Sequence, residues 1–237
     1  MTRPTSHTDP LEGRIIYVLV MTILVQFTYP ISAGGGWPQV AFQLFYMSLF
    51  VAGIYLVSSN RLLMYSLIVA SVAWVIVGTI GVFRPQVQWA GYLIIVYFQI
   101  ALTIVVLRYI FRARVVNRDV LLAACTAYLL IGAIFVPIYG LIETATYFPE
   151  QTAHAFADGV NEIGDGPIPW QILVYYSYAT LTTLGYGDVL PVTYWARSVA
   201  TFEAVLGVLY TAVIVARLVG LYAANEVDEE LEARDGQ

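Results

Sequence analysis

Six mostly apolar stretches, each close to the length of a helix that crosses a bilayer, dominate this sequence. They cover residues 15–33, 39–58, 62–83, 88–110, 120–142 and 196–223. A helix that spans the hydrocarbon core of a membrane needs about 20 mostly apolar residues. Short breaks rich in Gly, Pro, Ser or Arg separate the stretches. We therefore expect an all-α membrane protein with six transmembrane helices.

The composition excludes several classes of function. Of the 237 residues, 59% are hydrophobic and only 11% are charged, whereas a soluble domain carries about a quarter charged residues. Lipid must therefore cover much of the surface. A net charge of −5, with no basic stripe, argues against a nucleic-acid partner. The apolar stretches contain no His/Cys cluster, no paired carboxylates and no nucleophile beside a base, so we expect neither an enzyme nor an organic cofactor.

The basic residues predict how the chain is oriented in the membrane. All 11 are Arg, and lysine is absent. Basic residues gather on the cytoplasmic side of membrane proteins. With both termini inside, only Arg84 and Arg197 lie outside, against nine on the cytoplasmic side. We expect a multi-pass protein of the plasma membrane with cytoplasmic termini, and the lack of lysine favours a prokaryotic source with a GC-rich genome.

One segment between the fifth and sixth stretches does not fit the spanning pattern. An acidic loop is followed by residues 170–183, which are apolar but too few to cross the membrane and return as helix. Such a segment is tolerated at membrane depth where protein or a water-filled cavity surrounds it. We predict a re-entrant helix. The loop is expected to concentrate cations at an outer mouth, or simply to remain solvated, through Glu143, Glu150, Asp158, Glu162 and Asp165.

The re-entrant segment ends in the most specific motif of the chain. It reads Thr183, Leu184, Gly185, Tyr186, Gly187 and Asp188. Glycine accepts dihedral angles that other residues resist, so the two glycines would let neighbouring carbonyls point the same way. A ring of such carbonyls can replace the water shell of a cation, and potassium channels are the known example.

Residues 175–222 resemble the pore module of potassium channels, especially those of the bacterial ion-channel superfamily. The resemblance implies a pore helix over 169–182 and a selectivity filter over 183–188, with K⁺ bound at Thr183, Leu184, Gly185 and Tyr186. It also implies that Tyr175, Tyr176 and Thr182 support the filter, with one tyrosine bonded to Asp188. Because the chain holds a single copy of this loop and a ring needs four, we expect a homotetramer.

The same resemblance assigns roles along the last helix. Gly207 falls where the family has a hinge glycine, although a glycine there also permits close helix packing. Helical spacing places Val208, Thr211, Val215 and Val219 on one face. These four residues are candidates to line the cavity and the inner gate, with ordinary packing as the alternative. Where some relatives carry a carboxylate that pairs with the filter aspartate, this chain has Ala179.

Two charged residues of the last helix need an explanation. Glu203 lies about two turns below the outer end of the helix, and an ionisable residue within a membrane span indicates a function. We expect Glu203 to hydrogen-bond behind the filter and to tune its stability or proton sensitivity, or otherwise to make a polar packing contact. For Arg217 we expect the guanidinium to reach the lipid headgroups, with a direct role in gating as the alternative.

The first four helices resemble the layout of a voltage sensor without its charges. The fourth stretch contains only Arg108, and no Asp or Glu occurs from Gly13 to Arg118. The expected domains are a four-helix domain over 1–118, a pore domain over 119–224, and a short acidic cytoplasmic tail over 225–237. We expect a K⁺ channel without steep voltage gating and without a soluble partner. The alternatives are a poorly selective cation channel and a non-conducting auxiliary subunit.

Overall fold

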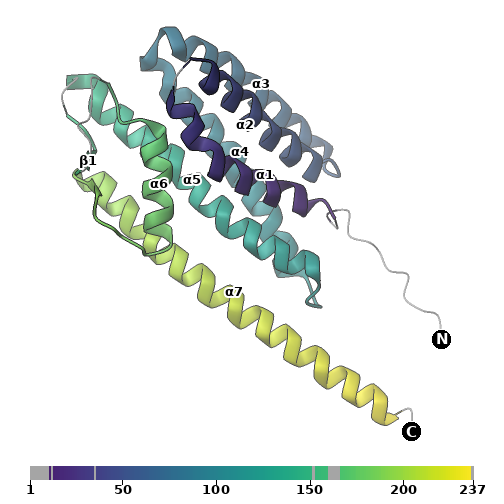
Figure 1. Ribbon diagram of the computed structural model, residues 1–237. Coiled ribbons are helices and arrows are strands. Elements are labelled where there is room, and N and C mark those ends of the chain that lie inside the picture. The colour runs from purple at the N-terminus through teal and green to yellow at the C-terminus, as the bar shows by residue number, and fades with distance from the viewer. Residues whose placement is uncertain (1–10, 12, 35, 151–152, 160–165, 236–237) are drawn as a thin grey trace.

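The computed structural model describes residues 11, 13–34, 36–150, 153–159 and 166–235, and most of these residues are helical (Figure 1). The α-helices are α1 (Ile15–Thr28), α2 (Gly36–Leu56), α3 (Arg61–Phe83), α4 (Gln88–Arg112), α5 (Arg118–Glu150), α6 (Trp170–Leu181) and α7 (Tyr194–Asp235). Two 3₁₀ turns, Tyr29–Gly34 and Pro85–Val87, precede α2 and α4. The strands are β1 (Phe156–Asp158) and β2 (Val189–Pro191).

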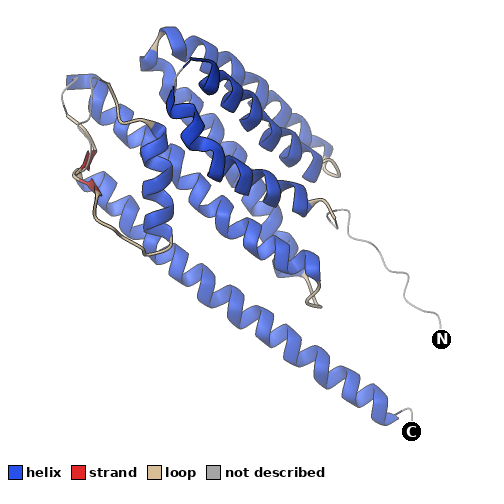
Figure 2. Cartoon of the chain, viewed as in Figure 1, coloured by secondary structure: helices blue, strands red, loops and turns tan. Residues whose placement is uncertain are grey.

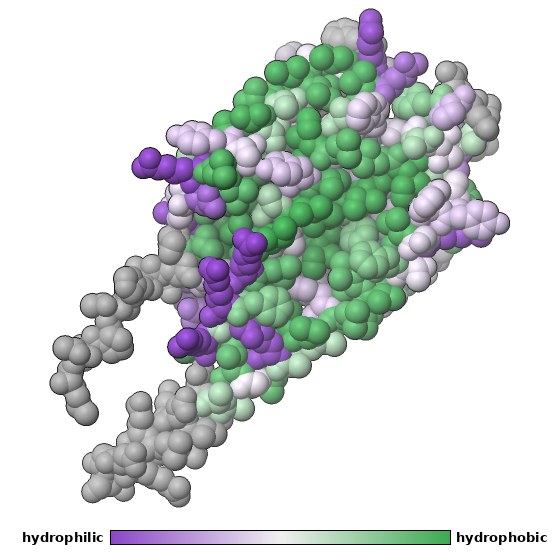
Figure 3. Space-filling view, turned by 180° about the vertical axis from the view of Figure 1, so that it is seen from behind, coloured by the Kyte–Doolittle hydropathy of each residue, from purple (hydrophilic) through white to green (hydrophobic). Residues whose placement is uncertain are grey.

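Five of the described helices, α1, α3, α4, α5 and α7, are long and apolar enough to cross a membrane. In α2 the apolar part that can be described is Leu44–Leu56, which is shorter than a span. Figure 3 shows a broad hydrophobic band between hydrophilic ends. The prediction of a helical, multi-pass membrane protein is therefore confirmed, and the crossing by the second helix stays a prediction.

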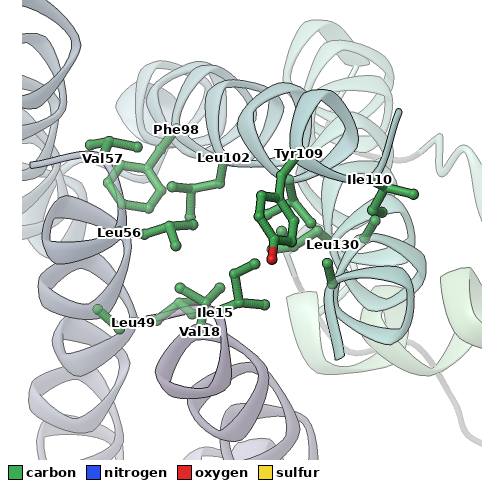
Figure 4. Packing of buried hydrophobic residues seen from close by; sticks show 14 of the residues in the cluster. Ile15, Val18, Leu49, Leu56, Val57, Phe98, Leu102, Tyr109, Ile110 and Leu130 are labelled. Atoms are coloured by element: carbon green, nitrogen blue, oxygen red, sulfur yellow. The ribbon is translucent and has the colours of Figure 1, made fainter. Parts of the chain in front are cut away.

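The main core joins the first four helices to α5. Figure 4 shows Ile15 of α1, Leu56 of α2, Phe98 of α4 and Leu130 of α5 among its buried side chains. Helices α2 and α4 approach closely at Gly53, where a Cβ atom would lie 2.8 Å from the Phe98 ring. Residues 113–117 alone connect α4 to α5, so α4 folds back along the helix that follows it.

Helix α5 continues well past residue 142, where we expected the fifth span to end. It runs to Glu150 and contains Pro137 and Pro149. The Thr144 hydroxyl donates to the carbonyl of Gly140 at 2.9 Å, which satisfies this polar side chain within the helix. The expectation that Glu143 lies in an outer loop is wrong, because it is a buried residue of α5.

Helix α6 lies between α5 and α7. The chain after α6 runs back towards the end of the molecule at which α6 begins (Figure 1). That return leads into β2, which pairs antiparallel with β1 and matches Ala157 with Leu190 (Figure 2). The sequence did not predict this two-stranded sheet. It fastens the segment after α5 to the segment that follows residues 183–188.

Helix α7 is unbroken from Tyr194 to Asp235. Its first 31 residues, Tyr194–Ala224, form the candidate span, and the helix then continues through 225–235 of the expected tail. Residues 236–237 lie outside the described part. The start of α1 and the end of α7 lie at the same end of the molecule (Figure 1).

Candidate ion-conduction site

The backbone of residues 183–188 alternates in handedness. Thr183, Gly185 and Gly187 have positive φ angles of 57°, 53° and 78°. Among the described residues, Thr183 is the one non-glycine residue with positive φ. In a regular strand successive residues face opposite sides, whereas alternation between left-handed and right-handed residues turns successive carbonyls towards one side. This segment can therefore present a row of carbonyl oxygens to an ion.

The C-terminus of α6 holds the start of this row. The carbonyl of Ala179 accepts hydrogen bonds from the amides of Leu184 (2.9 Å) and Gly185 (3.3 Å). The Thr183 amide donates to the Thr180 carbonyl at 3.0 Å, and the Thr182 hydroxyl donates to the Tyr178 carbonyl at 2.7 Å. Thr182 thus supports the segment by continuing the last turn of the helix.

The far end of the row is held by Asp188. Its Oδ2 accepts a hydrogen bond from the Tyr175 hydroxyl at 2.7 Å, and its Oδ1 accepts from the amide of Val189 at 3.0 Å. The hydrogen bond to Asp188 raises the pKa of Tyr175 to about 12, so the hydroxyl keeps its proton at neutral pH. The Asp188 carbonyl also accepts from the Gly159 amide, which links it to the end of β1.

Tyr175, and not Tyr176, makes the hydrogen bond that we expected from one member of this pair. Tyr176 of α6 is buried and packs edge-on against Tyr139 of α5 and Phe156 of β1, with ring centroids 5.1 and 5.0 Å apart. It therefore packs α6 against α5 and β1, and its hydroxyl does not bond the aspartate.

The row of carbonyls is uncovered in the single chain. Leu184 and Tyr186 are 54% and 69% exposed. Below them, Thr182 and Thr183 share a hollow of about 380 Å³ with Gly207, Val208 and Thr211 of α7. The structure thus brings the inner end of the motif together with three of the predicted inner-helix residues. Val215 and Val219 lie further along α7, exposed, and outside this hollow.

Gly207 allows α7 to touch the end of α6. A Cβ atom at this position would lie 2.3 Å from the Leu181 carbonyl oxygen. Helix α7 passes through Gly207 without a break. Of the two interpretations open for Gly207, the geometry supports close packing.

Glu203 is fully buried at the junction of α5, α6 and α7. Its Oε1 lies 2.6 Å from the Ser177 hydroxyl of α6, and its Oε2 accepts a hydrogen bond from Tyr139 of α5. These two hydroxyl groups therefore hold the carboxyl group between α5 and α6.

Two charged groups have partners that the sequence could not indicate. The Arg217 guanidinium donates to the carbonyls of Ile110, Phe111 and Ala113 at the C-terminus of α4, at 2.8 to 3.3 Å. These carbonyls are partners that we did not predict, and whether Arg217 also reaches the lipid headgroups stays a prediction. Backbone carbonyls carry no residue signature, so no sequence pattern could have revealed this contact.

Glu143 is the second such group. Its carboxylate oxygens accept from the amides of Ala155 (2.8 Å) and Ile168 (3.0 Å), and Oε1 lies 2.7 Å from His154 Nδ1. It ties the segment before α6 to the end of α5. Of the other acidic residues expected in this loop, Glu162 and Asp165 lie outside the described residues.

Comparison with known proteins finds a family match over the part of the chain that holds this site. Residues 123–223 match the model of a protein family described as ion channel. The matched region begins in α5 and ends in α7, so it contains every residue of the site described above from Tyr139 to Arg217. No curated protein and no solved structure matches the chain significantly. The match supports an ion channel.

Proposed function

We propose that the protein is a potassium-selective channel that conducts K⁺ passively across the plasma membrane. The observation that carries this proposal is the alternating backbone of residues 183–187, fixed at one end by Ala179 and at the other by the Tyr175–Asp188 hydrogen bond. K⁺ would bind to carbonyl oxygens of Thr183, Leu184, Gly185 and Tyr186, with the Thr183 hydroxyl at the inner mouth. Such oxygens replace the water shell of the ion.

The proposed assembly is a homotetramer. One chain supplies one exposed row of carbonyls, and a single row cannot surround an ion. Four copies around one axis would close the ring and would also enclose the hollow beside Val208 and Thr211. The C-terminus of α6 points toward that hollow, where the negative end of a helix dipole favours a cation. With both termini in the cytoplasm, the filter would open to the outside.

The experiment that tests this function is a reversal-potential measurement. Purified protein in planar bilayers, with K⁺ on one side and Na⁺ on the other, should give a reversal near the K⁺ limit and block by Ba²⁺. The variant Gly185→Ala should abolish this selectivity, because alanine resists a φ of 53°. The matched variant Gly220→Ala, where nothing lies within 4 Å of an added Cβ, should preserve it.

Two results would point to the other candidates. Clear single-channel openings that reverse near zero would indicate a poorly selective cation channel. A folded tetramer that conducts nothing under any applied stimulus would indicate an auxiliary subunit.

A further inference from the structure

The contacts around Glu203 determine how many hydrogens its surroundings must contain. Three oxygen–oxygen contacts form a chain through the junction of α5, α6 and α7. Tyr139 Oη contacts Glu203 Oε2, Glu203 Oε1 lies 2.6 Å from Ser177 Oγ, and Ser177 Oγ lies 2.8 Å from the Gly132 carbonyl oxygen. Each contact at such a distance needs one hydrogen between its two oxygens.

The two hydroxyl groups supply only two of the three hydrogens. Tyrosine and serine carry one hydroxyl hydrogen each, and a carbonyl oxygen carries none. If Glu203 were ionised, Ser177 could donate to Glu203 or to Gly132 but not to both, and the remaining pair of oxygens would repel. A proton on Glu203 Oε1 completes the chain, with Glu203 donating to Ser177, Ser177 donating to Gly132, and Tyr139 donating to Oε2.

We propose that Glu203 is a positioning residue that carries a resident proton and, through Ser177, holds the pore helix against α5 and α7. All three side chains are fully buried, and an ionised carboxyl at this depth would be costly. The protonation of Glu203 follows from the contacts alone. Its role in supporting a filter rests on the proposed function.

Glu143, a second buried carboxyl group among the described residues, provides an internal comparison. Glu143 receives hydrogens from two backbone amides, which can only donate, and contacts His154 Nδ1. With the histidine tautomer that carries its hydrogen on Nδ1, all three contacts are supplied with hydrogens by the partners of Glu143. The same count therefore requires a proton on Glu203 and requires none on Glu143.

The surroundings of Glu203 also set the expected effect of pH. The titratable groups that face it are Tyr128 and Tyr139 of α5 and Tyr176 and Tyr178 of α6. Tyrosines are neutral at ordinary pH, so none of them compensates a negative charge. When rising pH removes the proton from Glu203, Ser177 can donate to only one of its two partners. One of the three hydrogen bonds is then lost, and α6 is held less firmly.

Infrared spectroscopy of the purified full-length protein tests the protonation directly. At neutral pH the protein should show the carbonyl stretch of a protonated carboxylic acid. Glu203→Gln should remove this band, and Glu143→Gln should leave it. Loss of the band in Glu143→Gln only, or its absence from the wild type, would overturn the proposal. Because no ion flow is measured, this result is independent of whether the protein conducts K⁺.

A second variant, which retains Glu203, tests whether the carbonyl band of the protonated acid belongs to this residue. Tyr139→Phe removes the hydrogen bond to Oε2, the carbonyl oxygen of the protonated group, so the band should move to higher frequency. A band that does not move in folded Tyr139→Phe protein would contradict the proposed chain.

The positioning role is tested by rescue and by a pH profile. Glutamine preserves the hydrogen count, because its amide nitrogen can donate to Ser177 while its oxygen accepts from Tyr139. Glu203→Ala should lower the conducting fraction by about tenfold or more, since buried donors lose their acceptor, and Glu203→Gln should recover most of that loss. The wild type should lose current as pH rises and Glu203→Gln should not. Equal loss in both variants, or the same pH profile in both proteins, would show a merely structural contact.

Discussion

Gly207 and Gly220 lie on the same helix, yet only Gly220 has room for a methyl group. A Cβ atom at Gly207 would lie 2.3 Å from the Leu181 carbonyl oxygen, whereas nothing lies within 4 Å of one at Gly220. Backbone cannot move aside as a flexible side chain can, so Gly207→Ala must push α7 away from α6. We predict a melting temperature lower by several degrees, corresponding to about 1–3 kcal/mol for overpacking.

The control for this prediction is Gly220→Ala, measured by thermal unfolding of the purified protein. It should leave the melting temperature unchanged or slightly raised, because alanine favours a helix by about 1 kcal/mol over glycine. Equal melting temperatures for Gly207→Ala and the wild type, together with a lower open probability, would instead favour the hinge interpretation of Gly207.

The Tyr175–Asp188 hydrogen bond gives a second prediction at the level of single residues. Tyr175→Phe removes the hydroxyl that donates to Oδ2. A hydrogen bond to a charged group contributes about 1.5–3 kcal/mol, so the equilibrium between conducting and non-conducting filters should shift by about tenfold or more. Faster decay of single-channel activity would show this shift. Tyr194→Phe, at a tyrosine that is 88% exposed, should behave as wild type.

Some residue contacts could be predicted from the sequence and others could not. The motif over 183–188 identified the segment that the structure shows with alternating φ angles, because glycine spacing reflects backbone conformation directly. The partners of Glu143 and Arg217 are backbone groups of Ala155, Ile168 and the end of α4. Every residue type has such groups, so a sequence pattern cannot single them out.

At the level of elements, Arg217 connects α7 to the C-terminus of α4. Its guanidinium neutralises three carbonyls at the negative end of that helix. We predict that Arg217→Gln lowers the melting temperature by several degrees, since a hydrogen bond to a charged group contributes about 1.5–3 kcal/mol, and changes the open probability. Arg112→Gln is the matched control, because that side chain is exposed at the end of α4. The same loss in both variants would show only an effect of charge.

The boundaries of α5 and the small sheet show where element prediction failed. The acidic residues from Glu143 onward suggested a loop, but the carboxylate of Glu143 is satisfied by amides of Ala155 and Ile168, so the helix can continue through it. The β1–β2 pairing joins residues more than 30 positions apart in the chain. Local periodicity carries no information on a contact of that separation.

At the scale of the whole molecule, the first four helices offer little charge for the membrane field to move. Arg108 lies at one end of α4, exposed, and a charge gains about 2.3 kcal/mol per 100 mV only if it crosses the field. We predict a shallow conductance–voltage relation that Arg108→Gln leaves unchanged, measured in planar bilayers. A steep relation that Arg108→Gln flattens would contradict this prediction.

The connection of only residues 113–117 between α4 and α5 has a consequence for biogenesis. So short a tether keeps the first four helices beside the α5 of their own chain, where the shared core packs them. Each newly made subunit can therefore complete this core before it meets another, and no helix has to be exchanged with a neighbour. If wild-type and variant chains were mixed in the proposed tetramer, a packing defect in this core would stay with the chain that carries it.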